Sequence, residues 1–365
     1  MFSPDCLPVL IGSLPLSSHR QAVELIFRFT PEIPLWPQLP ALSREGMVRQ
    51  FIDGFPGLID HGRKYWVDSD SDDFPGQMAS FYEEFFTGES QPHLPDVCCF
   101  SLPPDTARGF FTFTEMLEGG HYSPVTVKGQ VTGPVTTGIG VRDHRGAVLL
   151  HDDNLRDILV KLLGGKARWQ VERLKRYCAA VPPLVFIDEP GMVSFGSTAF
   201  AGISRELASE TVSPLIASIK GAGGLAGIHI CANGDWEPAL ASGADIISFD
   251  AYSYFDHFIL YRDHLASFLE SGGILAWGIV PTGDPDAVVR EQVESLYQAW
   301  KVQLEALCSL GFTSQYVVSR SLIAPACGTG SLSPGLAEKV LSMTRGLADR
   351  IRSDFALSPD DGAAR

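Results

Sequence analysis

The feature that most restricts the fold of this chain is the alternation of short apolar runs with longer amphipathic stretches. This alternation is typical of βαβ units and of a parallel sheet. Runs that are apolar at nearly every residue indicate strands covered on both faces. The predicted strands are PVLIGS (8–13), VCCFSL (97–102), VTVKGQVT (125–132), LVFID (184–188), LAGIHIC (225–231), DIISFD (245–250), ILAWGIV (274–280) and SLIAPA (321–326).

The amphipathic stretches predict the helices that cover this sheet. Residues 204–223, 285–311 and 334–355 each predict a helix, and residues 154–180 predict one helix or two helices broken near Gly164 and Gly165. Eight strands with helices between most of them favour a TIM (β/α)8 barrel. An open, doubly wound sheet is the alternative, because periodicity does not report closure. We therefore expect an α/β barrel that forms a single domain over residues 1–365.

A segment of about residues 30–96 interrupts the alternation after the first strand. It contains IPLWPQLP (33–40) and the acidic VDSDSDDFPG (67–76), and it is too short for a core of its own. We predict an insertion that forms a wall or lid over the active site. Trp36 would then contact a ligand; the alternative is that Trp36 plugs the core of the barrel.

The net charge of −15 restricts the partners of the protein. Such a surface repels nucleic acid and anionic membranes, so we expect neither as a partner. No apolar run approaches the roughly 20 residues that span a bilayer. The N-terminal sequence MFSPDCLPVLIGSLP lacks the pattern of a signal peptide, and we expect a cytoplasmic protein. The seven cysteines are irregularly spaced, which argues against a disulfide framework.

Polar side chains gather where the predicted strands end, which is where TIM barrels carry their chemistry. These side chains are Asp188, Glu189, His229, Cys231, Asp250 and Cys327. His229 and Cys231 are two residues apart, so on a strand they point to the same face. An imidazole with thiolates suits zinc, which takes about four ligands. Ordinary packing of a His-x-Cys pair is the alternative to this metal site.

The motifs GSLP, VTGPVT, IDEP, HIC and a late CG turn occur in this order in a known superfamily. The chain resembles the catalytic C-terminal barrel of the cobalamin-independent methionine synthases over about residues 8–350. Zinc-dependent corrinoid:thiol methyltransferases and uroporphyrinogen decarboxylases belong to the same superfamily. The resemblance implies zinc held by His229, Cys231 and Cys327. Asp250 stands where that family has a further ligand, a glutamate.

The resemblance also implies an activity and its substrate contacts. Ile11 and Ser13 match a stretch that contacts homocysteine. Asp188 matches the acid that holds the substrate amine and is the predicted catalytic residue, and Glu189 beside it is a further predicted substrate-binding residue. The implied enzyme is of the 5-methyltetrahydropteroyltriglutamate–homocysteine S-methyltransferase type, of methionine biosynthesis. It would methylate homocysteine, with a methylated corrinoid, free or on a protein, as donor.

Two departures from the methionine synthase pattern keep other functions open. A second amine-binding glutamate in a motif like HGEP is not found, and HICAN is closer to the HICGN of the corrinoid-dependent thiol methyltransferases. One alternative is therefore a corrinoid-dependent methyltransferase that acts on another thiol. A second is a uroporphyrinogen decarboxylase-like enzyme without metal, and a third is a non-catalytic protein that holds zinc or a corrinoid partner.

Overall fold

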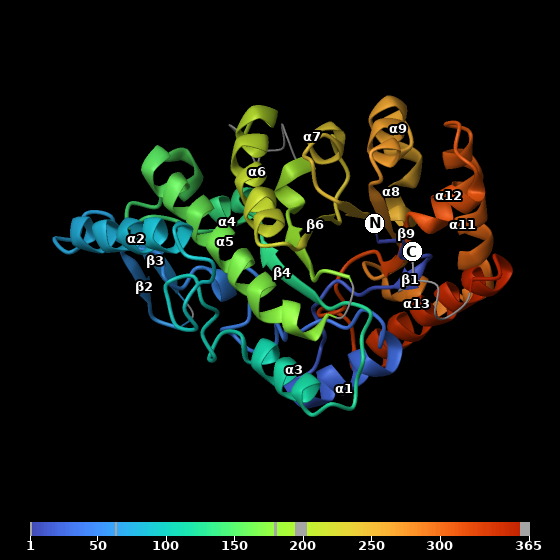
Figure 1. Ribbon diagram of the computed structural model, residues 1–365, viewed down its shortest axis with the longest axis horizontal. Helices are drawn as coiled ribbons and strands as arrows, with labels where there is room; N and C mark the ends of the chain where they lie inside the picture. Colours follow the sequence, from blue (N-terminus) through green and yellow to red (C-terminus); the bar gives the residue numbers. More distant parts are fainter. Residues whose placement is uncertain (1, 63, 179–180, 194–202, 358–365) are drawn as a thin grey trace.

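A curled sheet of parallel strands runs through the centre of the molecule, and helices surround it (Figure 1). The structure, a computed structural model, describes residues 2–62, 64–178, 181–193 and 203–357. Within these residues seven parallel strands pair in the order β1-β9-β8-β7-β6-β5-β4. Their bounds are β1 (Leu7–Pro8), β4 (Lys128–Thr132), β5 (Leu184–Asp188), β6 (Leu225–Ile230), β7 (Ile246–Phe249), β8 (Ile274–Val280) and β9 (Ser321–Pro325). This architecture is consistent with a TIM-like fold.

The full eight-stranded barrel is not shown, because an irregular segment lies between β1 and β4. Residues 33–38 contact both strands through isolated bridges, from Gln38 to Ser13 and from Leu35 to Lys128. The N–H of Lys128 donates to the carbonyl of Pro34 at 2.9 Å. Prolines at 34 and 37 carry no N–H, so this segment cannot build a regular ladder.

The predicted strand at 97–102 is wrong, since these residues form turns and bends. The N–H of Ser101 donates to the carbonyl of Cys98 at 3.0 Å, which closes a turn. Phe100 and Leu102 are 2% and 1% exposed, so the apolar run reports core residues on a loop. A run of four to six apolar residues does not by itself distinguish a strand from such a loop.

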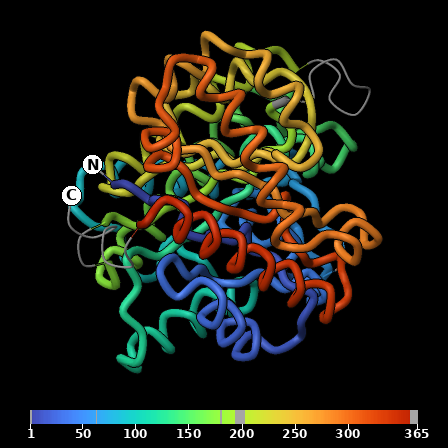
Figure 2. Tube along the Cα trace, turned by 90° about the vertical axis from the view of Figure 1, so that its right-hand side faces the viewer, coloured from blue at the N-terminus to red at the C-terminus, as the bar shows by residue number. Residues whose placement is uncertain are grey.

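Helices pack on the sheet and on one another around it. α5 packs against α6 and β4, and α13 lies beside α1, as Figure 2 shows. The helices are α1 (His19–Phe29), α2 (Phe74–Glu89), α3 (Arg108–Glu118), α4 (Pro134–Gly140), α5 (Asp153–Leu174), α6 (Arg205–Gly221), α7 (Glu237–Leu240), α8 (Ala251–Phe258), α9 (Arg262–Glu270), α10 (Pro285–Arg290), α11 (Val293–Cys308), α12 (Ser314–Ser319) and α13 (Pro334–Asp354), with 3-10 turns η1 (Arg49–Phe51), η2 (Leu149–His151), η3 (Lys175–Tyr177) and η4 (Pro190–Val193).

The two glycines in the middle of α5 do not break the helix. They allow close packing: a Cβ on Gly164 would lie 2.9 Å from Oγ of Ser218 in α6, and a Cβ on Gly165 would lie 2.2 Å from the ring of Phe100. The predicted helix at 285–311 is instead divided into α10 and α11, because Glu291 and Gln292 adopt extended backbone between them.

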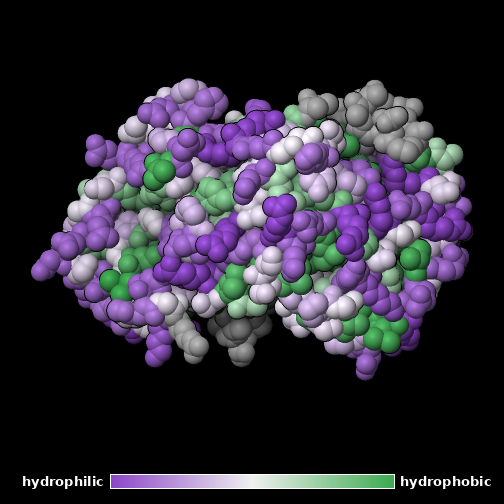
Figure 3. Space-filling model, turned by 90° about the horizontal axis from the view of Figure 1, so that it is seen from below, coloured by the Kyte–Doolittle hydropathy of each residue, from purple (hydrophilic) through white to green (hydrophobic). Residues whose placement is uncertain are grey.

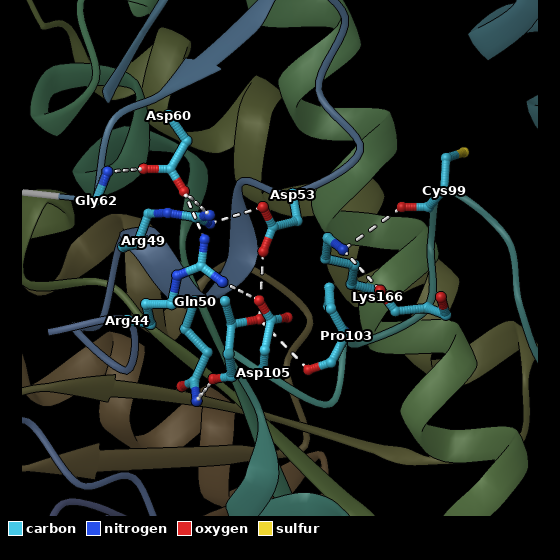
Figure 4. A network of polar contacts seen from close by, with 12 residues as sticks. Arg44, Arg49, Gln50, Asp53, Asp60, Gly62, Cys99, Pro103, Asp105 and Lys166 are labelled. Carbon is cyan, nitrogen blue, oxygen red and sulfur yellow. Dashed lines mark hydrogen bonds and ion pairs between the residues drawn. The ribbon is translucent and has the colours of Figure 1, made fainter. Parts of the chain in front are cut away.

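The insertion carries a small hairpin and helix α2 to one side of the sheet (Figure 1). Strands β2 (Leu58–Asp60) and β3 (Tyr65–Val67) pair antiparallel. Figure 4 shows Arg49 between two carboxylates, at 2.7 Å from Asp53 and 2.5 Å from Asp60. The ammonium of Lys166, in α5, donates to the carbonyl of Ser101 at 2.9 Å, which fixes the loop beyond α2 to the helical layer.

The interior of the curled sheet changes character along the strands. Apolar side chains fill one end, namely Leu7, Val9, Ile11, Leu184, Phe186, Ile246, Ile274, Ala276, Leu322 and Ala324. Polar side chains occupy the carboxyl ends of β5, β6 and β7. The outer face seen in Figure 3 is largely hydrophilic with small separate hydrophobic patches. None of the described helices has the length and apolar character needed to cross a membrane.

Candidate metal centre

Three predicted ligands converge at the carboxyl end of the sheet. His229 is the penultimate residue of β6, Cys231 follows that strand, and Cys327 lies two residues after β9; all three line one hollow. Their ligand atoms all lie within 4.8 Å of one another. Gly328, next to Cys327, lets this turn pass close to Ser13, because a Cβ there would lie 2.0 Å from Oγ of Ser13. The curled sheet thus brings together residues that are nearly one hundred positions apart in the chain.

The imidazole of His229 is oriented as a metal ligand requires. Its Nδ1 lies 2.9 Å from Oγ of Ser248, the residue paired with it on β7. Its Nε2 is buried and has no hydrogen-bond partner among the described residues. A buried polar atom without a partner is unfavourable by about 1–3 kcal/mol, and a metal ion bound at this nitrogen would remove that cost. His229, Cys231 and Cys327 fit zinc, with three protein ligands and one open position.

The two cysteine thiols interact with each other. A hydrogen bond from Cys327 holds the pKa of Cys231 below its ordinary value, while burial opposes this effect. The same hydrogen bond, together with burial, raises the pKa of Cys327. Cys231 is therefore the thiol that ionises first. Because thiolates are the form that binds metal, this pair is set up to release protons to a divalent cation.

Asp250 does not join the ligand cluster. Its carboxylate caps helix α8 and accepts a hydrogen bond from the N–H of Ser253 at 2.8 Å. Burial raises the pKa of Asp250, and the group of converging ligand atoms does not include it. An aspartate is one methylene shorter than the glutamate that the resemblance would place at this position. The predicted role of Asp250 as a metal ligand therefore has no support in this arrangement.

A hollow of about 270 Å³ lies beside the three ligands. Asp188, paired with His229 across β5 and β6, lines it with a buried Oδ1 that has no partner among the described residues. Burial raises the pKa of Asp188, and the charges of Lys128 and His229 act in the opposite direction. Ile11 and Ser13, the residues expected to contact the substrate, line the same hollow. The arrangement places a buried carboxyl group, one oxygen of which lacks a partner among the described residues, next to the candidate metal position.

Glu189 faces away from this hollow, which corrects its prediction as a substrate contact. Its carboxylate lies at the N-terminus of α4, where it accepts hydrogen bonds from the N–H groups of Val135 at 2.8 Å and Thr136 at 2.9 Å. Burial raises its pKa to about 7. A Cβ on Gly133 would lie 2.1 Å from this carboxylate, so the helix end is built around it. Glu189 joins β5 to α4.

The structure places residues in or below the hollow that the sequence did not predict. Glu45 lines it and is 3% exposed, with its Oε1 2.6 Å from Nε2 of His19. Lys128 is fully buried beneath it and donates to the carbonyl of Ile11 at 2.5 Å. Burial lowers the pKa of Lys128 to about 8. Glu45 comes from the insertion, and no periodicity or motif pointed to it.

Trp36 belongs to the core, and its prediction as a lid residue is wrong. The side chain is 0% exposed, and its Nε1 donates to Oε1 of Gln170 at 2.9 Å. The same proline-rich segment nevertheless forms a wall of the hollow through Gln38 and Pro40. The segment contacts the site with its later residues, while its tryptophan fills the space between sheet and helices.

Comparison with known proteins gives a likeness of fold. No family model matches the chain, and no curated protein matches it. A B12-independent methionine synthase from Shewanella sp. W3-18-1, solved with selenomethionine, is similar with a TM-score of 0.55 at 14% identity, over 97% of this chain and 100% of that one. A GH20 module of the pneumococcal exo-beta-D-N-acetylglucosaminidase StrH reaches a TM-score of 0.46 at 11% identity, over 99% of this chain and 90% of that one. This score is too low to support an inference about the present chain.

Proposed function

We propose that this chain is a zinc-dependent methyltransferase that methylates the sulfur of homocysteine, with a methylated corrinoid as donor. The observation that carries the proposal is the convergence of His229, Cys231 and Cys327 within 4.8 Å beside a hollow with an unpaired carboxyl group. The fold similarity to a methionine synthase supports a methyltransferase-like enzyme. Zinc held there would supply the Lewis acidity that keeps a substrate thiol ionised at neutral pH.

The protein's own residues would bind and orient the acceptor. The carboxyl group of Asp188 would pair with the ammonium of an amino-acid thiol, which gives its buried Oδ1 the partner it lacks. Ile11 and Ser13 would contact the remainder of the substrate from the end of the first strand. Holding the sulfur next to His229 and both cysteines leaves little freedom before the transfer, and such positioning is a large part of catalysis.

The metal site is tested by measuring zinc in purified protein. We expect about one zinc per chain, as three converging protein ligands imply. The variants His229→Ala, Cys231→Ser and Cys327→Ser should each lose most of it. Cys178→Ser is the matched control, because Cys178 lies outside the cluster and its thiol hydrogen-bonds with Thr126 and with the carbonyl of Leu174. Full zinc occupancy in the triple variant would refute the site.

The acceptor is tested by comparing thiols with and without an amine. Asp188→Asn should raise the KM for homocysteine much more than the KM for an alkanethiol of similar length, because only homocysteine carries the ammonium that Asp188 binds. Equal changes for both thiols would show that the acceptor is another thiol, which is the second candidate for this site. A decarboxylase of polycarboxylates is disfavoured, because the described lining of the hollow contains Asp188 and Glu45 and neither arginine nor lysine.

A further inference from the structure

A second hollow, of about 390 Å³, lies on the other side of the two cysteines. Cys231, Cys327 and Gly328 line both hollows, so the proposed metal position forms the boundary between them. The loops after β7, β8 and β9 build the second hollow, from residues 250–254, 281–284 and 326–331. His229 and Asp188 line only the first. A molecule in the second hollow would therefore approach a sulfur at the metal without displacing an amino acid held by Asp188.

The charged groups of the second hollow are all acidic. Asp250 and Asp284 line it, and no lysine, arginine or histidine is among its described lining residues. Each carboxylate also caps a helix, with Asp284 accepting the N–H of Asp286 at 3.0 Å, so both are held in fixed positions. Arg290, which does not line the hollow, donates to the hydroxyl of Tyr252 at 3.4 Å. Fixed carboxylates without cations disfavour an anionic ligand and favour a cationic one.

Two aromatic rings line the same space. Tyr252 and Tyr254, in the first turns of α8, are partly buried there. The hydroxyl of Tyr252 donates to Glu291 at 2.9 Å, which fixes that ring from outside the hollow. Aromatic faces combined with carboxylates are the usual surroundings of sulfonium and quaternary ammonium groups, because the ring quadrupole attracts a diffuse positive charge.

We propose that the second hollow binds the methyl donor and that this donor carries its methyl group on a positively charged centre. The inference rests on the proposed thiol methylation and adds the place and charge of the second substrate. In the transfer, the thiolate electron pair forms the new carbon–sulfur bond. The bond from the methyl carbon to the donor atom breaks with its electron pair, so the donor centre loses its positive charge and no further reactant is needed.

Two kinds of donor carry a methyl group on a positively charged centre, a small methyl-onium ion and a cationic methylcorrinoid, and an assay can distinguish them. A small methyl-onium ion would fit wholly within the hollow, as the volume allows. A methylcobinamide, which is a cationic corrinoid without the nucleotide phosphate, would present only its methyl-bearing face. Trimethylsulfonium and methylcobinamide are therefore the two probes, and 5-methyltetrahydrofolate is the anionic comparison. Each is offered to the zinc-loaded chain with homocysteine, and methyl transfer is followed by mass spectrometry.

The decisive variants lie on opposite sides of the cysteines. Tyr254→Leu should raise the KM for the cationic donor about two- to fivefold, as the loss of one cation–π contact at a partly exposed site predicts. Asp284→Asn keeps the capping oxygen and should also weaken the cationic donor. Neither should change the KM for homocysteine. Met47→Ala, in the first hollow, is the matched control and should change only the KM for homocysteine.

The proposal is overturned if the donor KM is the same in Tyr254→Leu and Asp284→Asn as in the wild type. It is equally overturned if 5-methyltetrahydrofolate is the better donor, or if none of the three probes methylates homocysteine. Zinc content and homocysteine binding, measured by calorimetry without any donor, report on the proposed function separately. Their persistence alongside a negative donor result would show that only the donor inference has failed.

Discussion

The orientation of His229 depends on one hydroxyl group, and removing it should weaken zinc binding. Ser248 is 0% exposed on β7, and its Oγ lies 2.9 Å from Nδ1 of His229. If Nε2 binds a metal, Nδ1 carries the proton, and this N–H donates a hydrogen bond to Oγ of Ser248. In Ser248→Ala the imidazole of the metal-free protein is free to change its orientation. An imidazole that binds zinc through Nε2 would have to keep its proton on Nδ1 in one fixed orientation, so the loss should fall on the zinc complex.

The size of the effect follows from the burial of both partners. An N–H left unpaired in a buried site costs about 1–3 kcal/mol, which corresponds to a zinc affinity weaker by about 5- to 150-fold. Substitutions of such supporting residues in zinc sites change affinity by about 10- to 100-fold, which is consistent with this range. The thiolate ligands are untouched, so zinc binding should be weakened and not abolished.

The assay is a zinc competition against a fluorescent chelator at neutral pH, with the unfolding free energy of the metal-free variant measured by urea. Ser321→Ala is the matched control, because Ser321 is also a buried strand serine, with its Oγ 2.9 Å from Nε1 of Trp277. It should lose stability without losing zinc affinity. If folded Ser248→Ala binds zinc with an affinity within about twofold of the wild type, the claim that Ser248 orients His229 for zinc is refuted.

Three further substitutions test the packing below the site. Trp36→Ala should lower the unfolding free energy by about 3–5 kcal/mol in urea denaturation while zinc content is unchanged, because the ring is fully buried away from the ligands. Burial lowers the pKa of Lys128 to about 8 from the ordinary 10.5. Between these pH values the unfolded chain holds the proton of Lys128 more than the folded chain does, so the free energy of unfolding rises with pH. Lys128→Met should therefore lose up to about 3 kcal/mol relative to wild type as pH rises through that window, measured by parallel denaturation curves. Gly133→Ala should destabilise by about 1–3 kcal/mol, because its Cβ would displace the Glu189 carboxylate.

The predicted strands agree best with the structure where the sheet is regular and covered on both faces. The ranges 184–188 and 274–280 coincide with β5 and β8. The ranges at β6 and β9 are one residue too long at one end, and the range at β7 is one residue too long at both ends. Nearly every residue of these strands is buried, so a continuous apolar run and a strand are the same feature there. The positions of His229 and Cys231 follow from these strands, since alternation fixes the face to which each side chain points.

The gap between β1 and β4 could not be predicted from apolar runs. Residues 33–38 contact both neighbouring strands, yet Pro34 and Pro37 interrupt the pattern that identifies a strand. The apolar run at 97–102 was assigned to the sheet in their place. The difference between the two segments is their tertiary contact, which local sequence does not contain. For the same reason the sequence did not indicate Glu45, whose position depends on how the insertion folds back over the strand ends.

Asp188 and Glu189 show how far alternation can be used to assign roles to neighbouring residues. Adjacent residues at the end of a strand point to opposite faces, so the inner face can take only one of two consecutive acids. Asp188 is paired with His229 and faces the hollow, whereas Glu189 accepts the N–H groups at the start of α4. A carboxylate is favourable at a helix N-terminus, which gives the second acid a structural task. Glu189 therefore serves the fold, and Asp188 is the acid that is available to a substrate.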